Sequence, residues 1–178
     1  MRKFTIIVAL LFSGVTLGWL SARFMMQNAA GAAGSDLAGW TEIRLTGDDL
    51  RPTYEAGYYL WRGKVLPPSN VRLFRRVTDD EGNTLRGDCA VQLEGKIPDA
   101  RWWVVNLDGS GVSGSISAGT AIREMSGDAA ITVSQSPVPG NWIKPGSSTA
   151  YALQLVLQDL TIAPDQTPTL PSVKRLWC

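Results

Sequence analysis

The chain has 178 residues, with 17 basic and 16 acidic side chains and no histidine. This near-neutral balance provides no basic surface of the kind that binds nucleic acid. The lack of histidine excludes catalytic triads with a histidine base, histidine-ligated zinc and the histidine-carboxylate iron site. The sequence therefore indicates a protein that is not an enzyme and that needs no cofactor or metal.

The N-terminus has the order of parts found in a bacterial export signal or membrane anchor. Arg2 and Lys3 precede an uncharged apolar stretch of 19 residues, 4–22, which is about 28 Å long as a helix and so matches a hydrocarbon core of roughly 30 Å. Residues 1–26 are predicted to be a transmembrane signal anchor, with the body of the protein in the periplasm. A cleaved signal stays open as the alternative, because Ala30-Gly31-Ala32 has the form that signal peptidase reads.

The rest of the chain divides into a tether and one domain. Residues 27–39 are small and polar and predict a flexible tether, whereas residues 40–178 have the size of a single domain. Three of the 17 basic residues lie in residues 1–27, so the remainder has 14 basic and 16 acidic residues and a net charge of −2.

Hydrophobic periodicity indicates a mainly β domain. Residues 40–45 predict a first strand, and residues 50–62 predict the one main helix, with an aromatic face toward the sheet, because apolar side chains recur there at helical spacing before Pro67-Pro68. After that the period becomes two. Residues 71–77 and 89–93 predict a hairpin around the turn-forming residues 79–83.

Later segments extend the same pattern. Residues 102–107, 131–133 and 151–158 predict strands, residues 111–120 a loop, residues 121–125 a helical turn and residues 137–146 an irregular stretch. No alternation of strands and helices is present to build a parallel sheet. The predicted fold is an antiparallel two-sheet sandwich or a jelly-roll-like domain, preceded by a transmembrane helix.

The two cysteines, Cys89 and Cys178, favour a disulfide if the domain is exported. Such a bond would close a loop of about 90 residues, for which the chain-entropy model gives roughly 4–5 kcal/mol. Two unpaired buried thiols are the alternative.

Three local patterns occur in an order that resembles the bacterial domain of unknown function 1214 family, in particular its short, membrane-anchored members. The likeness covers roughly residues 48–178. The patterns are Gly87-Asp88-Cys89 leading through Pro98-Asp99-Ala100-Arg101-Trp102-Trp103 to Asp108-Gly109, then Pro139-Gly140-Asn141-Trp142-Ile143, then Leu170-Pro171-Ser172-Val173-Lys174-Arg175-Leu176. The resemblance implies a β-sandwich that often occurs beside a domain of unknown function 1254, with no activity established for the family.

Aromatic residues supply the candidate binding site. Adjacent Trp102 and Trp103 must point to opposite faces of a regular strand, so they cannot both enter the same core layer. A ligand groove is one interpretation, and packing beneath the predicted helix is the other. The groove would be lined by Trp61, Arg101, Trp102, Asn141 and Trp142.

Charged residues offer weaker candidates. Asp99 and Asp108 lie about 30 Å apart in an extended strand, too far for the acid and base of a glycosidase. The acidic run at residues 79–81 superficially resembles a calcium loop, but a hairpin turn explains it. The cluster Arg72, Arg75 and Arg76 is interpreted as the solvated face of a strand.

These features predict a domain tethered to the inner membrane that binds an envelope protein, including a protein with domain 1254, or acts as a scaffold. The alternative is a module that binds a small molecule or a glycan through the aromatic groove. Secretion to the periplasm after signal cleavage is the alternative location.

Overall fold

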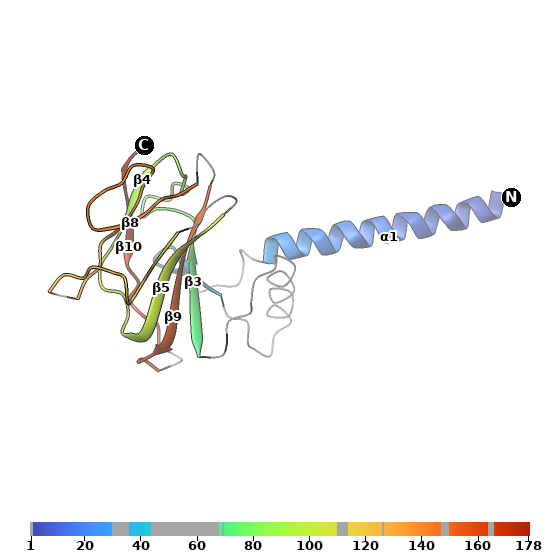
Figure 1. The fold of residues 1–178 in the computed structure, drawn as a ribbon. Coiled ribbons are helices and arrows are strands. Elements are labelled where there is room, and N and C mark those ends of the chain that lie inside the picture. The colour runs from blue at the N-terminus through green and yellow to red at the C-terminus, as the bar shows by residue number, and fades with distance from the viewer. Residues whose placement is uncertain are drawn as a thin grey trace. The chain divides into compact units, whose positions relative to one another are not determined.

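The structure is a computed structural model that describes residues 2–29, 36–43, 68, 70–109, 114–125, 127–146, 150–163 and 166–178 (Figure 1). The chain divides into two units, residues 1–33 with 45–66 and residues 34–44 with 67–178. The helix predicted at residues 50–62, which includes Trp61, lies outside the described residues.

The apolar N-terminal segment forms helix α1 (Arg2–Ala29). Its part Lys3–Phe24 has 22 residues and a mean hydropathy of 2.0, so it is long and apolar enough to cross a membrane. The hydroxyls of Ser13 and Thr16 donate to carbonyls one turn earlier, which satisfies these polar groups inside the helix. The predicted apolar helix is confirmed.

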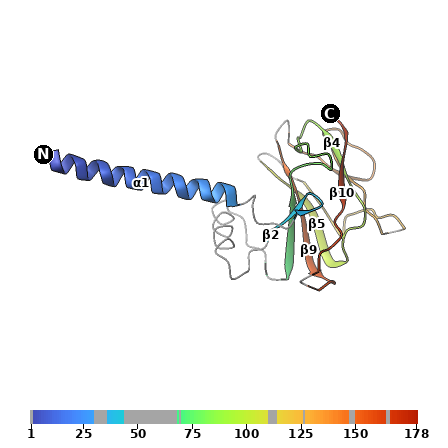
Figure 2. The ribbon, with the colours of Figure 1, turned by 180° about the vertical axis from the view of Figure 1, so that it is seen from behind.

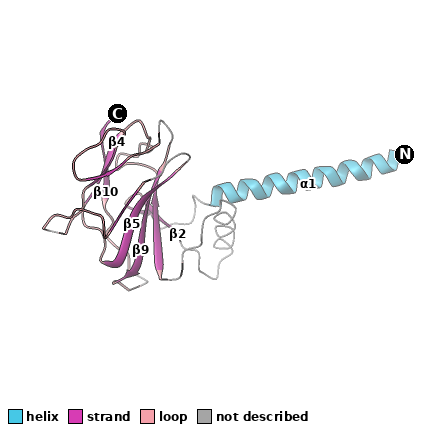
Figure 3. Ribbon diagram, viewed as in Figure 1, coloured by secondary structure: helices cyan, strands magenta, loops and turns pink. Residues whose placement is uncertain are grey.

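The β domain is built from two sheets. The six-stranded sheet has the order β1-β2-β3-β9-β5-β6, and the four-stranded sheet has the order β10-β4-β7-β8. Figure 1 shows β5, β9 and β3 of the first sheet side by side, and Figure 3 shows the strands in magenta. Neighbouring strands are antiparallel except β7 and β8, which are parallel. The strands are β1 (Asp36–Leu37), β2 (Trp40–Ile43), β3 (Val71–Arg76), β4 (Ala90–Glu94), β5 (Ala100–Asp108), β6 (Ser115–Ser117), β7 (Ile131–Val133), β8 (Asn141–Ile143), β9 (Ala152–Leu160) and β10 (Ser172–Trp177).

Alternate side chains of the two sheets meet in one core. In β9, Leu153, Leu155 and Leu157 are fully buried, as their period of two predicts. They pack in a single cluster with residues of the other sheet, among them Val91 of β4 and Ile131 of β7. The predicted β-sandwich is therefore confirmed.

The hairpin predicted between residues 71–77 and 89–93 is wrong, although both strands exist. Only a short ladder closes the turn, with Thr78 bridged to Thr84. Arg86 then bridges to Ala150, just before β9. The turn after Arg86 leads the chain out of the first sheet and into β4 of the other sheet. Alternation identifies a strand with a buried face, but it does not identify the neighbouring strand.

Three short strands lie where the sequence predicted a tether, a loop and an irregular stretch. These strands are β1, β6 and β8, and their two or three residues are too few for a period to show. Ala38 and Gly39 between β1 and β2 have φ values of 54° and 82°, as in a type I′ turn, so the sheet begins at Asp36 and not at Trp40. The described residues 121–125 contain no helix, because the side chain of Asn141 binds both backbone groups of Ile122.

Arg76 links this hairpin to the rest of the domain and is buried, with 3% of its surface exposed. Its Nη1 donates to the Ala38 carbonyl at 2.9 Å, its Nε to the Thr78 carbonyl at 2.7 Å and its Nη2 to Asp80 at 2.6 Å. The neighbouring indole of Trp40 donates to the Pro171 carbonyl, just before β10, at 2.8 Å. Figure 2 labels β2, which carries Trp40, and β10. Asp80 also accepts hydrogen bonds from the Val173 N–H of β10. The Arg76–Asp80 contact and the Trp40–Pro171 hydrogen bond therefore both join the six-stranded sheet to the region of β10.

The predicted disulfide is present in the structure. Cys89, just before β4, is bonded to Cys178, just after β10, across 89 residues. Because β4 and β10 are paired strands, the bond fixes the chain end to the strand beside it.

The two sheets meet at their edges where β6 lies against β8. A Cβ at Gly114, next to β6, would lie 2.5 Å from Cγ2 of Ile143 in β8. We expect Gly114→Ala to lower the free energy of unfolding by about 1–3 kcal/mol, because a buried side chain must move. Urea unfolding of the full chain in detergent, followed by tryptophan fluorescence, measures the loss.

Gly119→Ala is the matched control, because nothing lies within 4 Å of a Cβ at that position. It should stay within about 0.5 kcal/mol of the wild type. If Gly114→Ala and Gly119→Ala lowered the free energy of unfolding by similar amounts, the close contact between Gly114 and Ile143 would not explain the loss.

Candidate functional site

The residues predicted to line one groove fall into two groups. Arg101 and Trp102 lie in β5 of the six-stranded sheet, whereas Asn141 and Trp142 lie in β8 of the four-stranded sheet. Trp61 lies outside the described residues. The structure thus brings the predicted residues together in pairs and not as a single lining.

The two neighbouring tryptophans of β5 point to opposite faces, as predicted. Trp103 is 3% exposed and belongs to the core, whereas Trp102 is 41% exposed. Trp102 is opposite Gln158 of β9, and both line a broad, open depression together with Arg101. The guanidinium of Arg101 is 3.8 Å from Asp159, and its side chain is 82% exposed. An indole, an amide and a cation therefore share one outward-facing surface, the Trp102 surface.

Asn141 and Trp142 make their polar contacts within the chain. The Asn141 amide nitrogen donates to the carbonyls of Ile122 and Ala130, and its oxygen accepts from the Ile122 N–H at 2.7 Å. The Trp142 indole donates to the backbone carbonyl of Ser134 at 2.9 Å. Asn141 therefore fixes the loop that carries Ile122.

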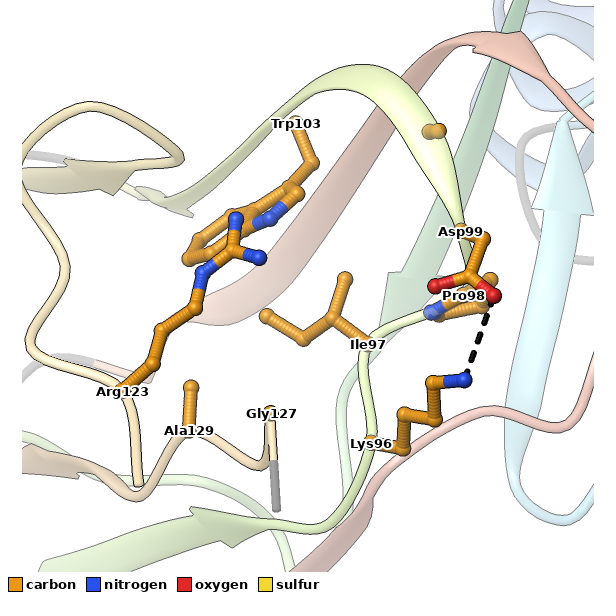
Figure 4. Close-up of a pocket in the computed structure, with 9 residues that line it drawn as sticks. Lys96, Ile97, Pro98, Asp99, Trp103, Arg123, Gly127 and Ala129 are labelled. Atoms are coloured by element: carbon orange, nitrogen blue, oxygen red, sulfur yellow. Dashed lines mark hydrogen bonds and ion pairs between the residues drawn. The ribbon is translucent and has the colours of Figure 1, made fainter. Parts of the chain in front are cut away.

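That loop and the start of β5 enclose a pocket of about 90 Å³ that the sequence did not predict. The guanidinium of Arg123 lies over the Trp103 ring, 5.4 Å from its centroid (Figure 4). On the other side, Lys96 pairs with Asp99 at 3.1 Å. The remaining walls are apolar and include Ile97 and Ala129. No sequence signal links Arg123 to Trp103, because 20 residues and a change of direction separate them. We refer to this site as the Trp103–Arg123 pocket.

The acidic candidates have structural contacts. Asp99 precedes β5 and Asp108 ends it, so the two carboxylates stand at opposite ends of a nine-residue strand. Asp108 accepts a hydrogen bond from Gln154 at 3.0 Å. This arrangement confirms that the pair cannot act together on one glycosidic bond. Among the described residues, no group of three or more acidic or cysteine side chains is placed to hold a metal ion.

The arginine cluster of β3 is not a solvated face, which corrects the sequence interpretation. Arg72 binds both oxygens of the buried Glu42 carboxylate at 2.7 and 3.1 Å, and Arg76 is buried against Asp80. Arg75 lies on the opposite face, 4.0 Å from Asp108. Alternation along β3 sends these side chains to different sheet faces, so they form no common anion site.

Asp79 explains the acidic turn that resembles a calcium loop. Its buried carboxylate accepts hydrogen bonds from the backbone of Glu81 and from the backbone and side chain of Asn83, and it lies 2.9 Å from Arg175. Burial alone would raise the pKa of Asp79, but the bonds from Asn83 and the charge of Arg175 together lower it. The carboxylate therefore closes the turn.

No protein-family model matches the sequence, and no curated protein matches it. Several solved structures match this chain, and two of them are the following. The VPA0106 protein from Vibrio parahaemolyticus shares 17% identity over 86% of this chain, with a TM-score of 0.56. An uncharacterised protein from Burkholderia cenocepacia shares 15% identity over 90% of this chain, with a TM-score of 0.49. This chain spans 42% of the length of each of those chains.

We expect Asp79→Asn to cost about 1–3 kcal/mol near neutral pH, because the buried hydrogen bonds lose their charged acceptor. Since folding lowers the pKa of Asp79, the stability from its charge is present above the ordinary value of 3.8 and is lost as the pH falls through the lowered value. The variant's stability should therefore converge on that of the wild type at acid pH. Urea unfolding of the full chain between pH 7 and pH 2 tests this.

Asp99→Asn is the control, because that side chain is 70% exposed in a surface pair. It should change stability little at any pH. A wild type and an Asp79→Asn variant that differ by a constant amount at all pH values would contradict the assigned linkage.

Proposed function

We propose that this protein is a single-pass inner-membrane protein whose β domain lies in the periplasm and binds an envelope protein, without catalysing a reaction. The observation that carries the proposal is Trp102, which exposes 41% of its surface in a regular strand where its neighbour Trp103 is buried. The exposed part of this indole is available for recognition.

The location rests on two features. Arg2 and Lys3 precede the apolar part of α1, and basic residues before a span favour a cytoplasmic N-terminus. A disulfide between Cys89 and Cys178 is typical of an oxidising compartment. Cleavage after Ala32 would release the same domain into the periplasm, and retention of α1 is the form that we propose.

The chemistry of the Trp102 surface favours a protein partner. Tryptophan and arginine are the residues most enriched at the energetic centres of protein interfaces, and here Arg101 and Trp102 share one depression. The depression is open, as a surface that meets another protein must be, whereas small-molecule sites enclose most of their ligand.

A protein with domain of unknown function 1254 is the partner that we favour. The resemblance to the 1214 family implies a neighbour of this kind. Less than half of the VPA0106 chain is covered by this chain, so that protein has room for a further domain. A complex of two separate chains is our proposal for the present protein.

A glycan is the second candidate ligand. Sugar rings stack on exposed indoles, and Gln158 and Arg101 beside Trp102 supply hydrogen-bond donors for hydroxyl groups. This function would use the same surface and would also need no catalytic group.

The location predicts that alkaline phosphatase fused after Cys178 is active in intact bacteria and that green fluorescent protein at the same position is dark. Mass analysis of the membrane fraction should find α1 retained. Deleting residues 2–24 should abolish phosphatase activity. A fluorescent fusion would contradict export, and a chain that starts at Ala33 would contradict the anchor.

A photo-crosslinking amino acid at Trp102 should capture a discrete envelope protein in living cells. Trp177, 53% exposed in the other sheet, is the matched control position and should not capture it. Trp102→Ala should reduce co-purification of that protein at least tenfold in a variant that still unfolds in one cooperative transition. Equal capture from both positions would contradict the proposal, and no protein capture together with oligosaccharide binding would favour the glycan.

A further inference from the structure

Arg123 differs from the other described arginines of the β domain. Each of those six has a carboxylate of the chain within 4.0 Å, whereas no described acidic side chain pairs with Arg123. The six paired residues are Arg72, Arg75, Arg76, Arg86, Arg101 and Arg175. Arg123 instead contacts an aromatic ring at the Trp103–Arg123 pocket.

One contact positions the guanidinium of Arg123, and hydrogen bonds fix the backbone that precedes it. The Trp103 ring is buried in the core and offers the guanidinium a fixed face for stacking (Figure 4). The Asn141 side chain binds both backbone groups of Ile122, the residue before Arg123. The tip of the loop is closed by the bond from Glu124 N–H to the Asp128 carbonyl at 2.9 Å. Stacking occupies the face of the guanidinium and leaves the N–H groups in its plane able to donate.

The walls define what the cation can bind. Ile97, Ala129 and Trp103 are each at least nine-tenths buried and present apolar surface to the pocket. Lys96 is already paired with Asp99, so Arg123 is the one unneutralised charge among the lining residues. One planar guanidinium matches one planar carboxylate through two parallel hydrogen bonds. A dianionic phosphate would meet the Asp99 carboxylate without a second cation to offset it.

We propose that the Trp103–Arg123 pocket binds a carboxylate that carries a short aliphatic group. Arg123 takes the carboxylate, and Ile97 and Ala129 contact the aliphatic part. A volume of about 90 Å³ admits a few carbon atoms beside the carboxylate. The carboxylate belongs either to a free short-chain acid or to the end of a peptide. The site is separate from the Trp102 surface, which lies on the other face of β5, so either proposal can fail alone.

The test uses ¹³C-labelled butyrate and the full chain in detergent, with the NMR line width of the ligand as the readout. The wild type should bind butyrate with a dissociation constant of roughly 1–10 mM, the range for so small a ligand. Butyramide, which has nearly the same shape and no charge, should not bind. Arg123→Gln should weaken butyrate binding at least tenfold, and Arg123→Lys should weaken it less, because the charge stays while the fork is lost.

Arg86→Gln is the matched control, since that arginine is 55% exposed, pairs with Asp88 and does not line the pocket. It should bind butyrate as the wild type does. Thermal unfolding of Arg123→Gln should match the wild type, which separates lost binding from lost structure. The proposal is overturned if the wild type does not bind butyrate or if butyramide binds equally well. It is also overturned if Arg123→Gln and Arg86→Gln bind butyrate with the same affinity.

Two peptides distinguish the sources of the carboxylate. A peptide that ends in alanine with a free carboxylate should displace butyrate if the natural ligand is a chain end, whereas its amidated form should not. Displacement by neither peptide assigns the pocket to a free acid. Displacement by both would overturn recognition of a carboxylate.

Discussion

Arg76 makes hydrogen bonds to two separate parts of the β domain and reaches a third through Asp80, and the sandwich depends on that convergence. Its guanidinium binds the β1–β2 turn at Ala38 and, in the turn after its own strand, the Thr78 carbonyl and the Asp80 carboxylate. Asp80 in turn accepts from the backbone N–H of Val173 in β10. A buried cation is stable only when its donors have acceptors. The carbonyls of Ala38 and Thr78 and the carboxylate of Asp80 must therefore all be in place for Arg76 to be buried. A Cβ at Gly39 would lie 3.0 Å from this guanidinium, which together with a φ of 82° explains the glycine.

The same reasoning explains why β10 is held at both ends. It is an edge strand with a partner on one side only, so it would fray without further contacts. Asp80 and Trp40 fix the region of its first residues, and the disulfide from Cys178 fixes its end to the strand beside it. Loop closure is costly across 89 residues, which makes this the place where a covalent link restricts the unfolded chain most. The disulfide between Cys89 and Cys178 is therefore part of how this fold is completed.

Sequence periodicity predicted the two longest strands. β5 and β9, with nine residues each, place Trp103, Leu155 and their neighbours as alternation requires. It predicted neither the partner of β4 nor the strands β1, β6, β8 and β10. Pairing depends on contacts far apart in the chain, and two or three residues carry no period. In β10 only Val173 is buried, so no alternation shows there. Arg76 was read as solvated for a related reason. Strand alternation gives its face, but only the fold shows that Asp80 and Ala38 reach it.

The candidate site shows the same division between local and distant information. Strand geometry requires Trp102 and Trp103 to face opposite ways, so one indole is exposed on the outer face and the other lines the pocket. The sequence could not predict that Asn141 fixes the loop of the pocket by binding Ile122. Asn141 and Ile122 are 19 positions apart, and each lies in a short or irregular segment. The sequence predicted Asn141 as a ligand-binding residue, and in the structure its three hydrogen bonds go to the backbone of Ile122 and Ala130 and set the position of the loop that carries Arg123. Asn141 can thus support binding without contacting the ligand, because it fixes the loop that carries the charged Arg123.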